Sequence, residues 1–197
     1  MTTIVIDFET TGLLVPGRDW SVQPGITQIG AVKLDADLKE VGVFHSLINP
    51  EMALAAWSER AIEITGIGPD QVKDAPTLFA VFPAFAEFVR GSREWTGWNT
   101  PFDRDVLWHQ LCRYGFEKNF PWPPEEIDAM KVFSASRNVQ GKRGTKFLKL
   151  GEAYELANGF PLKDAHDAVA DVRAVASVLR AMQEKVALGE KIVKRRK

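Results

Sequence analysis

Two carboxylates near the N-terminus have a spacing that suits a metal site. Asp7 and Glu9 lie at the end of the β-branched run 3–8. Side chains two residues apart on a strand point to the same face, so these carboxylates repel each other unless a cation lies between them. Mg²⁺ and Mn²⁺ prefer oxygen ligands, with water and phosphate completing the shell. Because Asp-x-Glu also occurs by chance, the pair alone indicates a metal site only weakly.

Two further acids stand near predicted helix starts. Asp103 follows the turn-like 98–102 segment, and Asp171 lies five residues after His166. A carboxylate in a first turn is favoured by the helix dipole, so Asp103 has a structural alternative. Asp167 as a helix cap and Asp171 as a surface acid are the corresponding alternatives near the C-terminus.

The combination and order of these motifs narrow the interpretation. Asp-Phe-Glu-Thr-Thr-Gly at 7–12, Asn-x-x-Phe-Asp at 99–103 and His-x4-Asp at 166–171 together resemble the DEDDh 3′-to-5′ exonucleases. That family includes the proofreading subunit of bacterial replicative polymerase, ribonuclease T and the TREX enzymes. The resemblance extends from Thr3 to about Met182, and it includes the segments 28–32, 49–50, 65–67 and 74–76 with Asp128.

The resemblance implies a ribonuclease H-like fold and a two-metal site. Asp7, Glu9, Asp103 and Asp171 would hold two divalent ions, Mg²⁺ or Mn²⁺, with Asp7 bridging both. Two ions about 4 Å apart can activate an attacking water and stabilise the leaving oxygen at phosphorus. His166 would take the proton from the water as general base.

Substrate contacts are also implied by the resemblance. Family members hold the terminal nucleotide with backbone groups after the second acid and place apolar side chains against its base. Such stacking recognises an end without reading sequence. The candidates are Thr10, Thr11, Gly12, Leu13, Ile67, Asn99 and Phe102. Phe102 has a plain core role as its alternative.

The chain departs from the usual family pattern at several positions. Many relatives have His where Trp98 and Thr65 stand, and an acid where Gln28 stands. None of these changes removes a predicted metal ligand. The loop 13–25 is longer than a hairpin needs, and its Trp20 is a candidate for substrate contact.

The elements that must position these residues predict an α/β fold. Strands are expected at Thr3–Phe8, Ile26–Leu34, Val41–Ile48, Glu94–Trp98 and Glu126–Phe133, the first three as an antiparallel meander. Helices are expected at 78–89, with a kink or break at Pro83, at 102–114, from a Thr145 cap to Gly159, and at 169–186. This order predicts a mixed β-sheet flanked by α-helices.

Length and charge bound the domain organisation and the partners. With 197 residues, the chain fits one exonuclease domain at 1–187, followed by a basic tail at 188–197. Its net charge of -1 argues against an overall positive field, so contact with nucleic acid must be local. The candidates for such contact are Lys142, Arg143, Lys146 and Lys149, and the tail residues Lys191, Lys194, Arg195, Arg196 and Lys197.

The remaining features predict a cytoplasmic protein with no membrane role. Cys112 is the single cysteine, and neither a signal-like segment nor a membrane-length apolar run is present. The leading hypothesis is an exonuclease acting on single-stranded DNA or frayed 3′ ends, free-standing or with a polymerase partner. The alternatives are an RNA-trimming 3′-to-5′ exoribonuclease, a non-catalytic domain that binds nucleic acid or a polymerase, and a structural domain.

Overall fold

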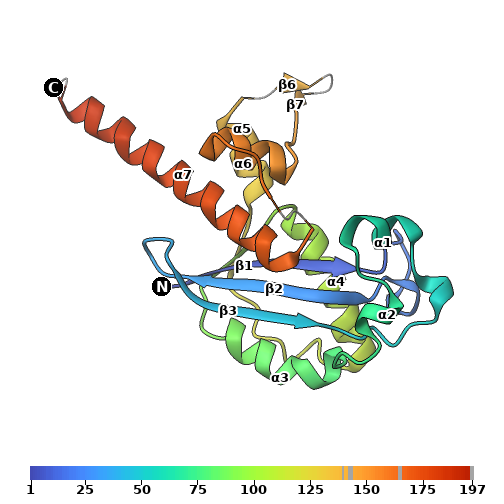
Figure 1. Ribbon diagram of the computed structural model, residues 1–197. Coiled ribbons are helices and arrows are strands. Elements are labelled where there is room, and N and C mark those ends of the chain that lie inside the picture. Colours follow the sequence, from blue (N-terminus) through green and yellow to red (C-terminus); the bar gives the residue numbers. More distant parts are fainter. Residues whose placement is uncertain (139, 142–143, 164–165, 196–197) are drawn as a thin grey trace.

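The molecule is built on a five-stranded mixed sheet, seen in a computed structural model that describes residues 1–138, 140–141, 144–163 and 166–195 (Figure 1). The strand order is β3-β2-β1-β4-β5. β1 (Thr3–Thr10), β2 (Ile26–Leu34) and β3 (Glu40–Leu47) form an antiparallel meander. β4 (Glu94–Gly97) lies parallel to β1, and β5 (Glu125–Asp128) lies parallel to β4. The predicted mixed sheet is confirmed.

Helices lie on both faces of this sheet. The helices of the described residues are α1 (Glu59–Thr65), α2 (Pro69–Val72), α3 (Leu78–Val89), α4 (Thr100–Tyr114), α5 (Ala129–Ser136), α6 (Leu150–Asn158) and α7 (Ala168–Arg195). Two 3-10 turns, Trp20–Val22 and Leu54–Ala56, and a short hairpin of β6 (Gln140–Gly141) and β7 (Gly144–Thr145) complete the described elements. Within the described part of the chain, no helix combines the length and apolar character needed to span a membrane.

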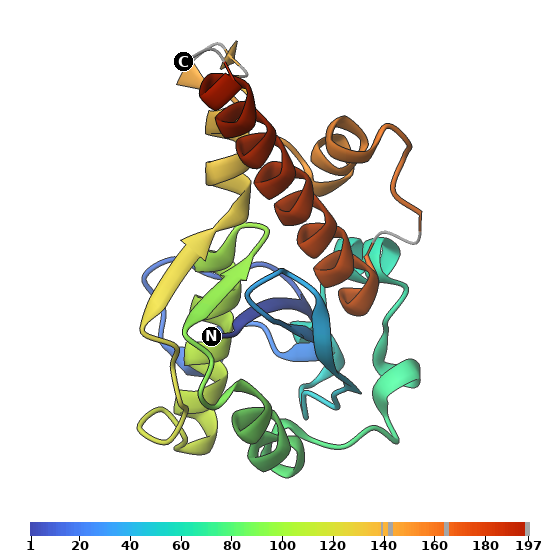
Figure 2. The same cartoon turned by 90° about the vertical axis from the view of Figure 1, so that its left-hand side faces the viewer.

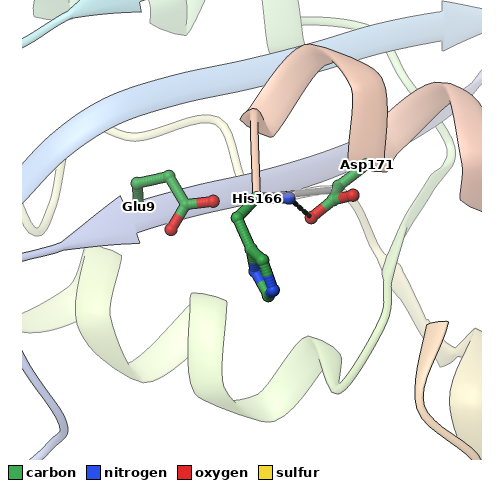
Figure 3. A group of neighbouring side chains, drawn as sticks. All are labelled: Glu9, His166 and Asp171. Atoms are coloured by element: carbon green, nitrogen blue, oxygen red, sulfur yellow. Dashed lines mark hydrogen bonds between the residues drawn. The ribbon is translucent and has the colours of Figure 1, made fainter. Parts of the chain in front are cut away.

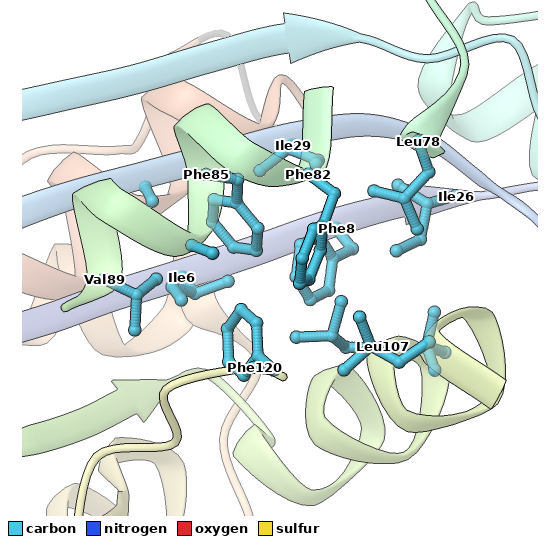
Figure 4. Packing of buried hydrophobic residues seen from close by; sticks show 14 of the residues in the cluster. Ile6, Phe8, Ile26, Ile29, Leu78, Phe82, Phe85, Val89, Leu107 and Phe120 are labelled. Carbon is cyan, nitrogen blue, oxygen red and sulfur yellow. The ribbon is translucent and has the colours of Figure 1, made fainter. Parts of the chain in front are cut away.

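The alternation of side chains along β1 decides which face carries the acids. Ile4, Ile6 and Phe8 belong to the main core with the apolar residues of α3 and α4 (Figure 4). Val5 packs with α7 residues on the opposite face of the sheet. Figures 1 and 2 show α7 crossing that face, with α3 and α4 on the other side. Asp7 and Glu9 continue the odd-numbered series and therefore face α7.

Some predicted elements differ from the structure. The predicted last strand ends at Asp128, and the following residues form α5, because the Asp128 carboxylate accepts a hydrogen bond from Met130 N at 3.1 Å and caps a helix. Thr145 lies in β7, whereas α6 begins only after its N-cap, Lys149. α3 continues through Pro83, so of the kink or break predicted there the break is excluded.

The basic segments are only partly described. Lys142, Arg143, Arg196 and Lys197 lie outside the described residues, as do the side chains of Lys191, Lys194 and Arg195. Lys146 Nζ makes an ion pair with Glu152 at 3.1 Å. The α7 backbone continues without interruption over 188–195. The division into a domain and a basic tail at 187/188 stays a prediction.

Candidate active site

Three elements bring the predicted acids to one end of the sheet. Asp7 and Glu9 project from β1 toward α7, and Asp103 and Asp171 lie in the first turns of α4 and α7. Asp103 is fastened to β1, because its Oδ1 accepts a hydrogen bond from Phe8 N at 3.2 Å. The start of α4 is thereby fixed against the strand that carries Asp7 and Glu9.

His166 joins this acidic group immediately before α7. One potential ligand atom from each of Glu9, His166 and Asp171 lies within 4.8 Å of the other two, and Figure 3 shows the three side chains as neighbours. The backbone N–H of His166 donates to Asp171 Oδ2 at 3.2 Å. His166 has a left-handed backbone with φ of 70°, which is unusual for a residue other than glycine.

Burial raises the pKa values of all four acids, and the charges of neighbouring carboxylates raise them further. Burial, with the charges of Asp171 and Asp167, raises the pKa of Asp7 to about 8. Burial, followed by the charges of Asp7, Asp171 and Asp167, raises the pKa of Glu9 to about 9. The pKa of Asp103 is raised well above its usual value, mainly by burial and by the charge of Asp7. Burial also raises the pKa of Asp171.

These carboxylates fit a divalent cation on an independent structural ground. Asp171 is 8% exposed, and among the residues that the structure describes its buried Oδ1 has no hydrogen-bond partner. A buried carboxylate oxygen in that state needs a partner, and its neighbours Glu9 and His166 offer further ligand atoms of the kinds that Mg²⁺ or Mn²⁺ accepts. A cation would also offset the repulsion among these carboxylates.

A cavity of about 310 Å³ opens beside Glu9. This volume falls within the range of about 300–1,000 Å³ that is common for small-ligand sites. Its walls come from β1, the segment after it, α1 and α4. They consist of Phe8, Glu9, Thr10, Gly12, Leu13, Ser58, Arg60, Ala61, Ile64, Thr65 and Phe102.

The predicted substrate residues divide into two groups around this cavity. Thr10, Gly12, Leu13 and Phe102 line it. Ile67, Asn99 and Thr11 do not line it. The nearest apolar wall of α1 is instead Ile64, and Asn99 is exposed, with its N–H donating to Asp128 Oδ1 at 3.3 Å.

Thr11 holds the chain around the cavity. Its N–H donates to Gly25 O at 2.9 Å, its hydroxyl accepts from Gly25 N at 3.1 Å, and its carbonyl accepts from Ser58 N at 2.8 Å. Thr11 was predicted to hold a nucleotide through its backbone, but its N–H and its carbonyl are both already bonded within the chain. These contacts tie the end of β1 to both the 13–25 loop and the start of α1.

The α1 wall was missed by the sequence motifs. Ser58 caps α1 by accepting from Ala61 N, and Arg60, Ala61 and Ile64 then face the cavity. The signal that could have found this helix is the pair Ser58-Glu59, a capping residue followed by an acid in the first turn.

Comparison with known proteins places the chain among nucleases. A family model described as exonuclease (RNase_T) matches residues 4–179. A Mycobacterium tuberculosis protein with the provisional name bifunctional exonuclease/endonuclease is 30% identical over 94% of this chain and 27% of its own length. The PolC-type DNA polymerase III of Caldanaerobacter subterraneus is 29% identical over 93% of this chain and 12% of its own length. The chain therefore spans only a small part of these relatives.

Solved structures share the fold. An Escherichia coli exonuclease I complex with single-stranded DNA superposes with a TM-score of 0.77 at 21% identity, covering 93% of this chain and 40% of that chain. The nuclease domain of 3′hExo, a DEDDh family member bound to rAMP, superposes with a TM-score of 0.72 at 21% identity, covering 93% and 92%. The chain belongs to the RNase_T exonuclease family and carries its DEDDh motifs on a ribonuclease H-like fold.

Proposed function

We propose that this chain is a metal-dependent 3′-to-5′ exonuclease that acts on single-stranded DNA and releases nucleoside monophosphates. The observation that carries the proposal is the juxtaposition of Glu9, His166 and Asp171 within 4.8 Å, next to the 310 Å³ cavity that Glu9 helps to line. A terminal nucleoside in that cavity would have its phosphodiester bond close to these groups.

The proposed roles follow from the position of each side chain. Asp7, Glu9, Asp103 and Asp171 would hold two divalent ions, Mg²⁺ or Mn²⁺, which when bound polarise the phosphodiester and lower the pKa of water. His166 would accept the proton of the attacking water. The cavity would hold the terminal nucleoside, with Leu13 and Phe102 against its base and the backbone of Thr10 and Gly12 beside its sugar.

DNA is proposed as the substrate because several relatives, such as the PolC-type enzyme above, are named as DNA polymerases. The solved neighbours bind both kinds of ligand, single-stranded DNA in exonuclease I and rAMP in 3′hExo. RNA trimming by the same chemistry is therefore the second candidate. Contacts to the 2′-hydroxyl decide between the two sugars.

The activity is tested with a 5′-labelled single-stranded DNA oligonucleotide and the matched RNA, each with Mg²⁺ or Mn²⁺. We expect a ladder that shortens from the 3′ end, faster on DNA, and abolished by EDTA and by Asp7→Asn. A faster ladder on RNA would replace DNA by RNA as substrate. Intact oligonucleotides with both metals would contradict the exonuclease and favour the domain that only binds.

Association with a polymerase and a cytoplasmic location belong to the same proposal. The association is supported by the match of this chain to 12% of the length of a PolC-type DNA polymerase III. Co-migration with a replicative polymerase subunit in gel filtration tests the association, and a chain that elutes alone would leave a free-standing nuclease.

A further inference from the structure

Gln28 on β2 contacts the segment 166–168, which leads into α7 and is called the His166 corner below. Its side chain is 4% exposed, and it lies opposite Glu9 in the β1–β2 register. Gln28 Oε1 accepts a hydrogen bond from Ala168 N at 3.1 Å. Gln28 Nε2 lies 3.1 Å from Asp167 Oδ2, to which it donates. One buried amide thus holds the two residues that follow His166.

The orientation of this amide is determined by its neighbours. Nε2 carries two hydrogens, so it can donate one to Asp167 and the other to His45 Nε2, which lies 3.0 Å away. The reversed amide would turn its N–H groups toward the Ala168 N–H and its oxygen toward the Asp167 carboxylate. Both contacts would then be repulsive. The neighbours of Gln28 therefore allow only the orientation with Oε1 toward Ala168 N and Nε2 toward Asp167.

The corner needs such support because its backbone is strained. His166 has φ of 70°, a left-handed conformation that is unfavourable in a residue other than glycine and persists only where surrounding contacts hold it. Asp167 Oδ1 caps α7 by accepting from Val169 N and Ala170 N at 3.1 and 2.9 Å. Asp167 therefore connects the start of α7 to Gln28 on the sheet.

We propose that Gln28 is a positioning residue for His166. It fixes Asp167 and Ala168 against β2, so that the strained His166 corner keeps the imidazole beside Glu9 and Asp171. This inference rests on the proposed function, because it assigns Gln28 to the placement of the general base of that reaction.

A double-mutant cycle tests whether Gln28 acts through His166. Gln28→Met removes the amide at similar volume, and a displaced catalytic group costs on the order of 10- to 100-fold in rate. We expect single-turnover cleavage of the DNA oligonucleotide to fall by that factor in the wild-type background. In the His166→Ala background, Gln28→Met should change the residual rate less than about twofold.

Gln110→Met is the matched control. Gln110 is also a buried glutamine, 1% exposed, but its Nε2 donates to Pro24 O at 2.7 Å on the 13–25 loop. Any effect of Gln110→Met on the cleavage rate should be the same factor in the wild-type background as in the His166→Ala background. An equal loss from Gln28→Met in both backgrounds, or no loss in the wild type, would overturn the proposal.

A readout independent of cleavage separates this inference from the proposed function. The Cα chemical shift of His166 reports its left-handed backbone, and we expect Gln28→Met to move it toward the average value in the metal-free protein. Gln110→Met should leave it unchanged. If the wild type cleaves nothing, the exonuclease fails but the shift still tests the positioning. If Gln28→Met does not fold, Gln28→Asn replaces it, because its shorter side chain keeps an amide but holds it farther from Asp167 and Ala168. An unchanged His166 Cα shift in the folded variant would contradict the positioning.

Discussion

Leu13 is an apolar side chain that is exposed to solvent at the edge of the candidate site. It is 82% exposed, and it lines both the 310 Å³ cavity and a neighbouring cavity of about 490 Å³. Because it is hardly buried, its removal should cost little stability. Burying a leucine side chain is worth about 1.5–3 kcal/mol, so if a nucleobase covers it, Leu13→Ala should raise KM for the oligonucleotide about 10- to 100-fold and leave kcat and Tm nearly unchanged.

Leu54 provides the control for that prediction. It is 72% exposed and lines none of the cavities described around the site. Leu54→Ala should therefore keep the KM of the wild type. Steady-state kinetics with both variants decide the matter, because equal KM values for the two would deny Leu13 any contact with substrate.

At the scale of elements, α7 reaches the site by packing directly on β2. A Cβ added at Gly30 would lie 2.4 Å from the backbone C and O of Ala168. Backbone cannot give way as a flexible side chain does, so Gly30→Ala should push the start of α7 away from the sheet. We expect a loss of about 1–3 kcal/mol in the free energy of unfolding. Cleavage should fall with it, because Asp171 and His166 move with α7.

Gly42→Ala is the control within the same sheet. Its added Cβ would meet the ring of Phe88 at 3.2 Å, a side chain that can shift. Denaturant unfolding and cleavage rates should therefore stay close to wild type. If Gly30→Ala also kept the stability and cleavage rate of the wild type, the start of α7 would not pack tightly on β2.

The sequence predicted those elements whose signals are local. The period of two on β1 places Asp7 and Glu9 on one face, and the apolar spacing after Ala168 predicts the last helix. Residues 129–133 of the predicted last strand were assigned to the wrong class because a short apolar stretch fits a strand or a helix, and the cap at Asp128 decides between them. The role of Gln28 depends on contacts 139 and 140 residues away, which no local pattern reveals.

At the scale of the whole molecule, the candidate site opposes folding when no metal is bound. Asp7 and Glu9 have pKa values raised to about 8 and about 9 in the folded chain. The unfolded chain has carboxyl pKa values near 4, so the folded state binds more protons between these limits. The free energy of unfolding of the metal-free protein should therefore fall as pH rises from about 4 to about 9.

A divalent cation should reverse this dependence. Its ligands must be ionised, so binding releases protons and strengthens as pH rises. A cation that binds only the folded chain also raises its stability. The difference in Tm between samples with Mg²⁺ or Mn²⁺ and with EDTA should widen from pH 5 to pH 9 by several degrees. Asp7→Asn should raise Tm in EDTA and shrink that difference, because it removes one of the repelling charges. A difference that stays constant with pH in the wild type would mean that the cation does not bind at these carboxylates.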